Sequence, residues 1–267
     1  MLTDPKSSLV KGVARLSKKD ARSQTGLFLL EGLQGLKEAV QRPKLIIEVY
    51  ATPECVERYP ELFDRVRAAR IDVMLVSDRV LEHMCDTTTP QGVVAVCEQL
   101  DVTLESVLAA KPRLITLLSQ VRDPGNAGTV LRAADAAGAD AVIFTDNSVD
   151  IYNPKVVRST TGSLFHLPVV TGVSVLEAVA AIQAAGIQVF AADGGGSLIT
   201  ELPAGTLAKP TAWVFGNEAW GFEPETLNAV NKVVGLPLYG PAESLNLATA
   251  ASVCLYQSAF AQRASNQ

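Results

Sequence analysis

The chain has 267 residues, of which 48% are hydrophobic and 19% are charged, and its formal net charge is −5. This length allows one large domain or two ordinary ones, and the composition excludes an intrinsically disordered chain. No run reaches the roughly 20 apolar residues of a membrane-spanning helix, and the first residues do not begin a secretory signal, so the cytoplasm is the expected location.

The cysteines and histidines indicate neither a metal site nor a disulfide framework. The four cysteines show no Cys-x-x-Cys pairing and most stand among apolar neighbours, while the two histidines, His83 and His166, are far apart. We therefore expect buried thiols and no bound metal.

A basic segment at the N-terminus moderates the objection that the negative net charge raises against a nucleic-acid partner. Residues 1–24 hold six basic and two acidic side chains, a local charge of +4. The basic residues are Lys6, Lys11, Arg15, Lys18, Lys19 and Arg22. Such an arm can supply local electrostatic attraction for a nucleic acid. A solvated helix face is an equally open interpretation.

The first part of the chain alternates apolar runs with helical patterns, which is typical of a small α/β domain. Strands are expected at 26–32, 45–50, 72–77 and 93–97, and helices at 33–40, 54–70 and 80–85. The segment Thr-Thr-Thr-Pro-Gln-Gly at 87–92 is a turn signal. We expect a first domain over 1–98 and a linker over 99–112, with a helical stretch at 104–109.

The pattern restarts at Arg113 and predicts a second α/β domain over 113–267. Strands are expected at 114–118, 141–145, 187–191, 212–215 and 233–238, and helices at 127–137, 175–185, 224–230 and 245–262. Short apolar strands between helices predict a buried parallel sheet. The run Gly194–Gly196 is interpreted as a flexible loop. Neither a Gly-x-Gly-x-x-Gly turn nor a phosphate-binding loop of the Gly-Lys-Ser/Thr type occurs at the expected place.

Polar residues follow three of the predicted strands. In Asp123-Pro-Gly-Asn-Ala-Gly-Thr-Val-Leu-Arg132, Asn126 can cap the helix, and Arg132 needs either an internal carboxylate or a substrate oxygen as its partner. In Val214-Phe-Gly-Asn-Glu-Ala-Trp-Gly-Phe222, Gly216 allows close approach of a ligand and Glu218 adds a carboxylate. Trp220 is expected to pack, and Gly221 to serve a turn.

The third such segment is Leu236-Pro-Leu-Tyr-Gly-Pro-Ala-Glu-Ser-Leu-Asn246, where Ser244 is the expected N-cap of the last helix. Ligands of open α/β sheets bind beyond the carboxyl ends of the strands. Because all three segments follow strands of one expected parallel sheet, we predict a shared site there.

In order and spacing these segments resemble the three motifs of the SpoU (TrmH) family of RNA 2′-O-ribose methyltransferases, which belong to the SPOUT class. The first domain is similar to the RNA-binding domain that often precedes the catalytic one, in Phe28-Leu-Leu-Glu-Gly32 and Thr88-Thr-Pro-Gln-Gly-Val-Val-Ala95. The resemblance implies a SPOUT-type parallel sheet with a C-terminal trefoil knot, preceded by a small α/β domain like the ribosomal protein L30e.

The resemblance also implies S-adenosyl-L-methionine as cofactor, RNA as substrate, and a homodimer whose sites lie at the subunit interface. Carried over by motif position, the cofactor contacts are Gly216, Leu236 and Leu245. The implied reaction site consists of Asn126, Arg132, Glu218, Ser244 and Asn246. The family pattern has glycine where this chain has Ala219, which puts the local loop geometry in doubt.

The expected function is transfer of a methyl group to a ribose 2′-hydroxyl, and the additional N-terminal domain favours ribosomal RNA as the substrate. Two alternatives stay open: a tRNA ribose methyltransferase with the same residues, and an RNA-binding module whose catalytic half has decayed. The target nucleotide, an antibiotic-resistance role, and the choice between naked RNA and a ribosomal subunit are undetermined.

Overall fold

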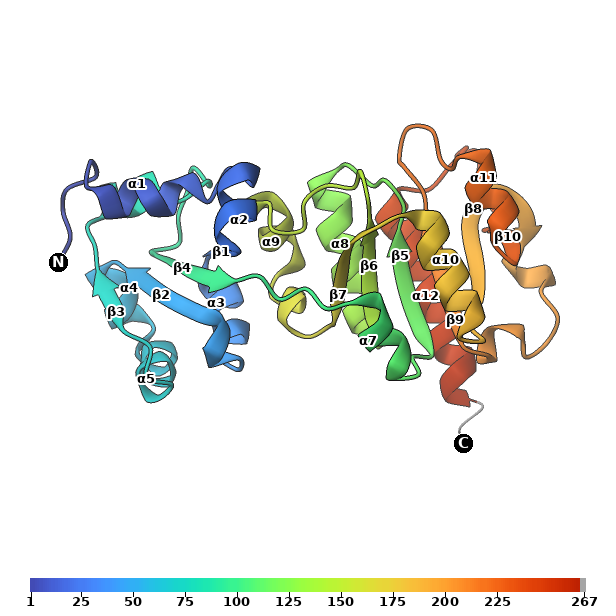
Figure 1. Ribbon diagram of the computed structural model, residues 1–267, viewed down its shortest axis with the longest axis horizontal. Helices are drawn as coiled ribbons and strands as arrows, with labels where there is room; N and C mark the ends of the chain where they lie inside the picture. The colour runs from blue at the N-terminus through green and yellow to red at the C-terminus, as the bar shows by residue number, and fades with distance from the viewer. Residues whose placement is uncertain (265–267) are drawn as a thin grey trace. The chain divides into compact units, whose positions relative to one another are not determined.

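The computed structural model describes residues 1–264, which form two compact units (Figure 1). The first unit contains residues 1–100 and 150–165, and the second contains 101–149 and the chain from 166 onward. The expected domains were continuous in sequence, whereas the structure groups 150–165 with the first unit. The end of the expected second domain, 265–267, lies outside the described residues. No described helix has the length and apolarity needed to span a membrane.

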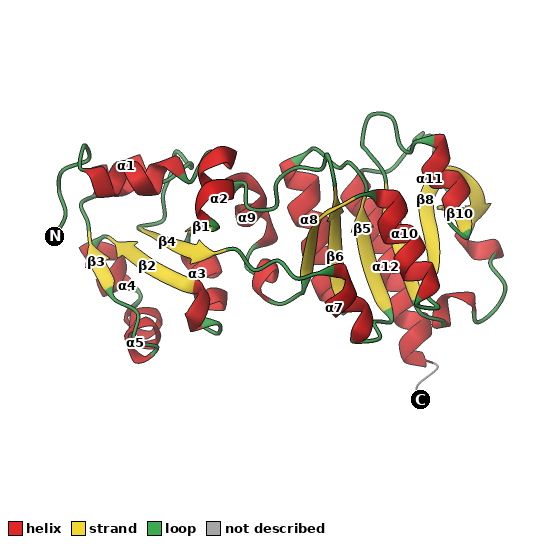
Figure 2. Cartoon of the chain, in the orientation of Figure 1, coloured by secondary structure: helices red, strands yellow, loops and turns green. Residues whose placement is uncertain are grey.

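The first unit is built on a four-stranded sheet of order β1-β4-β2-β3, in which only β2 and β3 are parallel. Its strands are β1 (Leu27–Glu31), β2 (Ile46–Ala51), β3 (Val73–Leu75) and β4 (Val93–Glu98). Its helices are α1 (Ser8–Arg15), α2 (Lys19–Thr25), α3 (Leu33–Ala39), α4 (Pro53–Arg58), α5 (Pro60–Ala68), α6 (Asp78–Met84) and α9 (Pro154–Thr160) (Figure 2).

Aromatic packing attaches the segment 150–165 to the first unit. The ring of Phe28 on β1 lies 4.9 Å from that of Tyr152 and 6.4 Å from that of Phe165, measured between centroids. The buried guanidinium of Arg22 pairs with Asp150 at 2.5 Å. These contacts join residues more than 120 positions apart, so the pattern along the sequence gives no indication of them.

The second unit contains a six-stranded sheet of order β10-β8-β9-β5-β6-β7, and every neighbouring pair is parallel. Its strands are β5 (Leu114–Leu118), β6 (Ala141–Thr145), β7 (Val169–Val173), β8 (Gln188–Leu198), β9 (Thr211–Phe215) and β10 (Lys232–Gly235). Its helices are α7 (Leu104–Ala109), α8 (Pro124–Ala137), α10 (Val175–Ala184), α11 (Pro224–Ala229) and α12 (Leu247–Ala264). The expected α/β class with a parallel sheet is confirmed.

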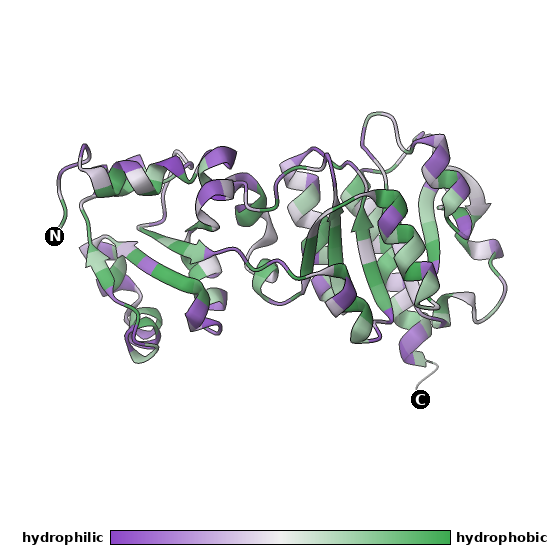
Figure 3. Cartoon of the chain, viewed as in Figure 1, coloured by the Kyte–Doolittle hydropathy of each residue, from purple (hydrophilic) through white to green (hydrophobic). Residues whose placement is uncertain are grey.

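Helices cover both faces of this sheet, with α7, α10 and α11 on one side and α8 and α12 on the other (Figure 1). Alternate residues of β5 divide between the two layers: Ile115 and Leu117 join the core under α7 and α10. The strands are mainly hydrophobic throughout (Figure 3), as expected for a sheet buried on both faces.

Several element boundaries differ from the sequence prediction. The single helix expected at 54–70 is two helices, because Pro60 disfavours helical geometry at Tyr59, where φ is −127° and ψ is 56°. The short elements α9 and β7 were not predicted. The interpretation of Gly194–Gly196 as a flexible loop is wrong, because these residues continue β8. Strand β10 ends at Gly235, so the third motif is almost entirely loop and α12 begins at Leu247.

Candidate active site

The three motif loops meet at one edge of the second unit. Strands β5, β8, β9 and β10 are neighbours and run in parallel, so their carboxyl ends lie together. The first loop leads from β5 into α8, the second leaves β9, and the third joins β10 to α12. The topology alone therefore brings together segments that are separated by more than 100 residues.

A pocket of about 500 Å³ opens between these loops. Seven of the eight predicted site residues line it: Asn126, Gly216, Glu218, Leu236, Ser244, Leu245 and Asn246. The eighth, Arg132, does not. The structure therefore places the expected cofactor contacts and most of the expected reaction residues around one cavity.

A hydrogen-bonded network links the three loops. The carboxylate of Glu218 accepts from the backbone amides of Arg122 and Asp123, at 3.3 and 3.2 Å, and from the side-chain amide of Asn126 at 3.2 Å. The side-chain amide of Asn246 donates to the Asn126 oxygen at 3.0 Å. Each motif thus contributes one member to a continuous chain of contacts that fixes the loops relative to one another.

Asn126 and Ser244 do not cap the helices that the sequence assigned to them. Asp123, not Asn126, caps α8, since its Oδ1 accepts from the amide of Asn126 at 2.7 Å. The proline that follows Asp123 favours this early start, because its fixed φ suits the first helical position. Asn246, not Ser244, caps α12, since its Oδ1 accepts from the amide of Ala248 at 2.9 Å. The side chain of Asn126 is therefore directed to the network.

The second loop closes on itself, which explains its glycines. Asn217 and Gly221 exchange two backbone hydrogen bonds of 2.9 Å, and a Cβ on Gly216 would lie 2.6 Å from the Gly221 oxygen. Gly221 has φ +70°, so it serves the expected turn. Ala219 does not have a positive φ, so alanine fits this loop without the backbone strain that the sequence raised.

Arg132 occupies an exposed position on α8 and not the apolar surroundings that its sequence neighbours predict. Six residues separate it from Asn126, which places it about 9 Å along the helix and about 120° around it. Within residues 1–264 its guanidinium makes no hydrogen bond or ion pair. Because it is hydrated, the charge needs no internal partner, and it remains free to contact a ligand or a second chain.

Trp220 is also exposed, with 48% of its surface accessible, so the expectation that it packs is wrong. The guanidinium of Arg122 lies 4.9 Å from the centroid of its ring, a cation–π arrangement. Trp220 lies in the loop that carries Glu218, so an exposed aromatic ring, with the exposed Arg122 cation over it, lies next in sequence to residues that line the pocket.

The pocket lining is acidic as well as apolar. Asp193, Glu218 and Glu243 contribute carboxylates, and no lysine or arginine is among the lining residues that the structure describes. Leucines from the third motif and Phe222 supply the apolar part. Such a lining favours a ligand that carries positive charge together with apolar surface. No cluster of three or more metal-ligating side chains occurs within residues 1–264.

Sequence reasoning missed three residues that shape the pocket. Asp193 lies in the glycine-rich part of β8 and accepts from the amide of Gly195 at 2.9 Å. Asn217 donates to the carbonyl of Gln120 at 2.7 Å, and Gln120 has a left-handed φ of 55°. A polar residue directly after an apolar strand was the available signal for Asp193. The roles of Asn217 and Gln120 depend on contacts between distant loops.

The basic N-terminal segment has five exposed cations, not six. Lys6, Lys11, Arg15, Lys18 and Lys19 are exposed on or beside α1 and α2. Arg22 is buried and donates to Asp150 and to the carbonyl of Leu16. It therefore holds the first unit together and is not available to RNA phosphates.

Family models match both parts of the chain. Residues 113–256 match the SpoU rRNA Methylase family, and residues 7–95 match the MRM3-like substrate binding domain. The chain is 34% identical over 252 residues to the Bacillus subtilis 23S rRNA (guanosine(2553)-2′-O)-methyltransferase RlmP, covering 94% of this chain and 96% of that protein. It is 32% identical over 259 residues to the Streptomyces viridochromogenes 23S rRNA (uridine(2479)-2′-O)-methyltransferase, covering 95% and 89%.

Solved structures agree with these sequence matches. The SpoU methyltransferase AviRb from Streptomyces viridochromogenes, in complex with AdoMet, superposes with a TM-score of 0.82 at 29% identity, over 97% of this chain and 100% of that one. The AdoMet-bound rRNA methyltransferase from Sinorhizobium meliloti superposes with a TM-score of 0.81 at 29% identity, over 96% of both chains.

Proposed function

The chain belongs to the SpoU rRNA methylase family, and on that premise we propose that it transfers a methyl group from S-adenosyl-L-methionine to a ribose 2′-hydroxyl of ribosomal RNA. The Bacillus subtilis and Streptomyces viridochromogenes proteins to which it is similar are named 23S rRNA methyltransferases. The observation that carries the proposal is the pocket at which all three motif loops meet, linked by hydrogen bonds between Asn126, Glu218 and Asn246.

The pocket suits this cofactor in charge and in chemistry. S-adenosyl-L-methionine carries a sulfonium and an ammonium cation, which the carboxylates of Asp193, Glu218 and Glu243 favour. Leu236 and Leu245 supply apolar contact for the adenine ring. Gly216 leaves room for close approach to the backbone. When bound, the cofactor provides an electrophilic methyl group next to the loops.

Each site residue has a proposed role in the reaction. Asn126, Asn246 and Ser244 position the ribose and the cofactor by hydrogen bonds, and Glu218 holds the first two loops in place. Arg132 would bind the 2′-oxygen or a neighbouring phosphate and stabilise the negative charge that develops on the oxygen as the hydroxyl gives up its proton to solvent water. A guanidinium stays protonated at neutral pH, so Arg132 acts as an electrostatic group and not as a base.

A homodimer would place Arg132 in the site of the second subunit. The exposed face of α12 carries Val253, Tyr256 and Phe260, of which Phe260 is 62% exposed. The hydroxyl of Tyr256 donates to the carbonyl of Ala136, one helical turn after Arg132 on the same face of α8. An apolar patch beside an uncompensated cation supports a surface that another copy of the chain covers.

The finer features of the fold are part of the same proposal. We propose that the segment after β9 forms a trefoil knot with the segment between β10 and α12, and that the first unit has an L30e-like fold. Likeness to the SpoU structures supports the knot, and the four-stranded sheet flanked by helices supports the L30e-like fold. The first unit would hold RNA, aided by the exposed cations of α1 and α2, and the protein would work in the cytoplasm.

The function is tested with methyl-labelled S-adenosyl-L-methionine and two RNA pools, ribosomal and transfer RNA, from cells that lack the gene. We expect label in ribosomal RNA. Label confined to transfer RNA would keep the reaction and overturn the substrate. Absence of label from both pools, from a protein that binds the cofactor, would contradict the proposed activity.

A further inference from the structure

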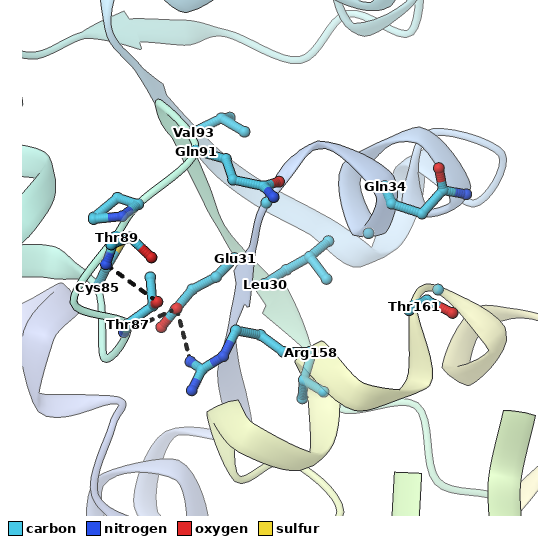
Figure 4. Close-up of a pocket in the computed structure, with 15 residues that line it drawn as sticks. Leu30, Glu31, Gln34, Cys85, Thr87, Thr89, Gln91, Val93, Arg158 and Thr161 are labelled. Atoms are coloured by element: carbon cyan, nitrogen blue, oxygen red, sulfur yellow. Dashed lines mark hydrogen bonds and ion pairs between the residues drawn. The ribbon is translucent and has the colours of Figure 1, made fainter. Parts of the chain in front are cut away.

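A second pocket, of about 260 Å³, lies wholly within the first unit. Three segments line it: residues 30–35 at the end of β1 and the start of α3, residues 85–93 leading into β4, and residues 157–162 of α9 and its end (Figure 4). The motifs that carried the resemblance in the first domain, 28–32 and 88–95, meet at this pocket.

The charged groups at the pocket are paired with one another. The side chain of Glu31 is only 3% exposed and accepts from the amides of Asp86 and Thr87, at 2.7 and 3.2 Å, and from Arg158 at 2.8 Å. Arg158 also pairs with Asp86 at 3.1 Å. Two carboxylates thus share one guanidinium, so this group of charges does not attract a phosphate. The two carboxylates bind the edge of the Arg158 guanidinium. Because the Arg158 side chain is still 29% exposed, the planar face of the guanidinium is left for stacking.

The remaining polar groups at the opening are neutral. The oxygen of Gln91 accepts from the amide of Leu33 at 3.2 Å, which leaves its NH₂ group for another acceptor. Gln34 donates its NH₂ group to Glu38 at 2.8 Å, which leaves its carbonyl oxygen. The hydroxyl of Thr89 adds a group that can donate or accept. Figure 4 shows the Gln34 amide directed away from Gln91 and Thr89, so the amide of Gln91 and the hydroxyl of Thr89 are the groups that can meet the hydrogen-bonding edge of a nucleobase.

The floor of the pocket is apolar and its wall is tightly packed. Leu30, Val93 and Val157 are buried and form the floor. Gly32 has φ +94°, and a Cβ there would lie 2.9 Å from the oxygen of Gln91. The glycine therefore allows the Gln91 side chain to lie across the pocket wall, where Figure 4 shows it.

We propose that this pocket binds one unpaired nucleobase of the substrate RNA, with the base edge on Gln91 and Thr89 and its face near Arg158. The inference rests on RNA methylation as the function, and it locates where the first unit holds the substrate. The ribose-phosphate backbone stays outside, since the paired carboxylates disfavour it. Sequence-specific RNA recognition commonly uses such extruded bases.

The test compares neighbouring substitutions in the full chain. Thr89→Val and Gln91→Ala remove pocket groups, while Thr88→Val and Gln24→Ala change exposed residues of the same types that do not line the pocket. The dissociation constant for unmodified 23S rRNA transcribed in vitro, and the KM and kcat of methyl transfer, are measured for each. We expect the pocket variants to raise the dissociation constant and the KM roughly tenfold each, with an unchanged kcat and unchanged cofactor affinity.

Unchanged RNA affinity in both pocket variants would overturn the proposal, and so would an equal loss in the two control variants. A loss of kcat at saturating RNA would place these residues in catalysis instead. A wild-type protein that binds the RNA but transfers no methyl group would contradict the proposed function alone, because the dissociation constants would still decide the question of the pocket.

Discussion

Asn126, Glu218 and Asn246 come from three separate loops, and hydrogen bonds between them fix the loops relative to one another. Four hydrogen bonds made by these three side chains join different loops. The rate of a reaction falls steeply when the reacting groups are displaced by about 1 Å from their productive positions. The network therefore has a mechanical task, orientation, in addition to any contact with substrate.

Glu218→Gln tests that task. A glutamine keeps the size of the side chain but lacks one acceptor oxygen, so the first loop loses part of its anchorage. We expect kcat to fall on the order of 100-fold, with folding preserved, while Glu223→Gln at an exposed position nearby has no such effect. An unchanged kcat in Glu218→Gln would show that the Glu218 carboxylate is not needed to orient the loops.

The cysteines give a prediction about reactivity. Burial, together with the nearby Glu31 carboxylate, raises the pKa of Cys85 to about 12, and burial raises the pKa of Cys254 to about 12. The thiolate is the reactive form, so we expect very slow alkylation of both in the native protein at pH 8 and faster alkylation as the pH rises toward 12. Mass spectrometry after iodoacetamide treatment measures this, with denatured protein as the fully labelled reference. Rapid native labelling at pH 8 would contradict the burial.

At the residue scale, sequence reasoning predicted that the three segments meet, and seven of the eight predicted residues line one pocket, but it did not predict the local hydrogen-bonding roles. Glu218 closely follows the apolar strand β9, which can be read locally, whereas the reaction-site roles of Asn126 and Asn246 came from the resemblance to the family motifs. The choice of cap could not be predicted, since Asp123 and Asn126 are both good caps and contacts with the second motif decide between them. The exposure of Arg132 likewise depends on which face of α8 meets the sheet.

At the scale of elements, the approach of β8 to β10 depends on one glycine. Strand β10 pairs first with Phe190 and Ala191 and then with Ser197 and Leu198, so the residues between them bulge out. This bulge brings Asp193 into the pocket. A Cβ on Gly196 would lie 2.4 Å from the carbonyl carbon of Val233, whereas Gly194 has open space.

Gly196→Ala should therefore destabilise the protein, and Gly194→Ala should not. The new methyl group would meet backbone that cannot move without breaking strand pairing. We expect a loss of about 1–3 kcal/mol of unfolding free energy, or more, for Gly196→Ala, measured by urea denaturation. Equal stability of the two variants would show that β10 can shift away from β8.

The elements that could be predicted were those with long apolar runs or clear helical spacing, including β5, β6, β9, α7 and α10. Strand β7 was missed because Thr171 and Gly172 interrupt its apolar run and it lies at the sheet edge. Helix α9 is short, and its packing on β1 comes from distant aromatic contacts. Such elements form through tertiary contacts, which a local pattern does not contain.

At the scale of the whole molecule, the acidic net charge and the RNA substrate are reconciled by distribution. Five exposed cations lie on or beside α1 and α2, while acidic side chains line the pocket of the second unit. Under the proposed function, RNA phosphates and the sulfonium of the cofactor would bind to different segments of one acidic chain.

Mixed dimers test whether Arg132 serves the partner's site. We expect Arg132→Ala to lower transfer by about 100-fold or more while cofactor affinity is retained, and Asn246→Ala to be inactive. If the two residues act in one site from different subunits, a dimer of one Arg132→Ala subunit and one Asn246→Ala subunit has one intact site of two. Random exchange makes about half of the dimers mixed, so the expected activity is about one quarter of that of the wild type. Arg65→Ala is the control at an exposed arginine. No recovery in mixed dimers shown to form would place Arg132 in its own subunit's site.

The chemical position of the transferred methyl group tests the central claim most directly. Unmodified 23S rRNA is incubated with the protein and methyl-labelled S-adenosyl-L-methionine, then hydrolysed with alkali, which does not cleave next to a 2′-O-methylated ribose. We predict label in an alkali-stable dinucleotide, and none with Asn246→Ala. Label recovered only in mononucleotides would mean methylation of a base and would contradict the proposed reaction.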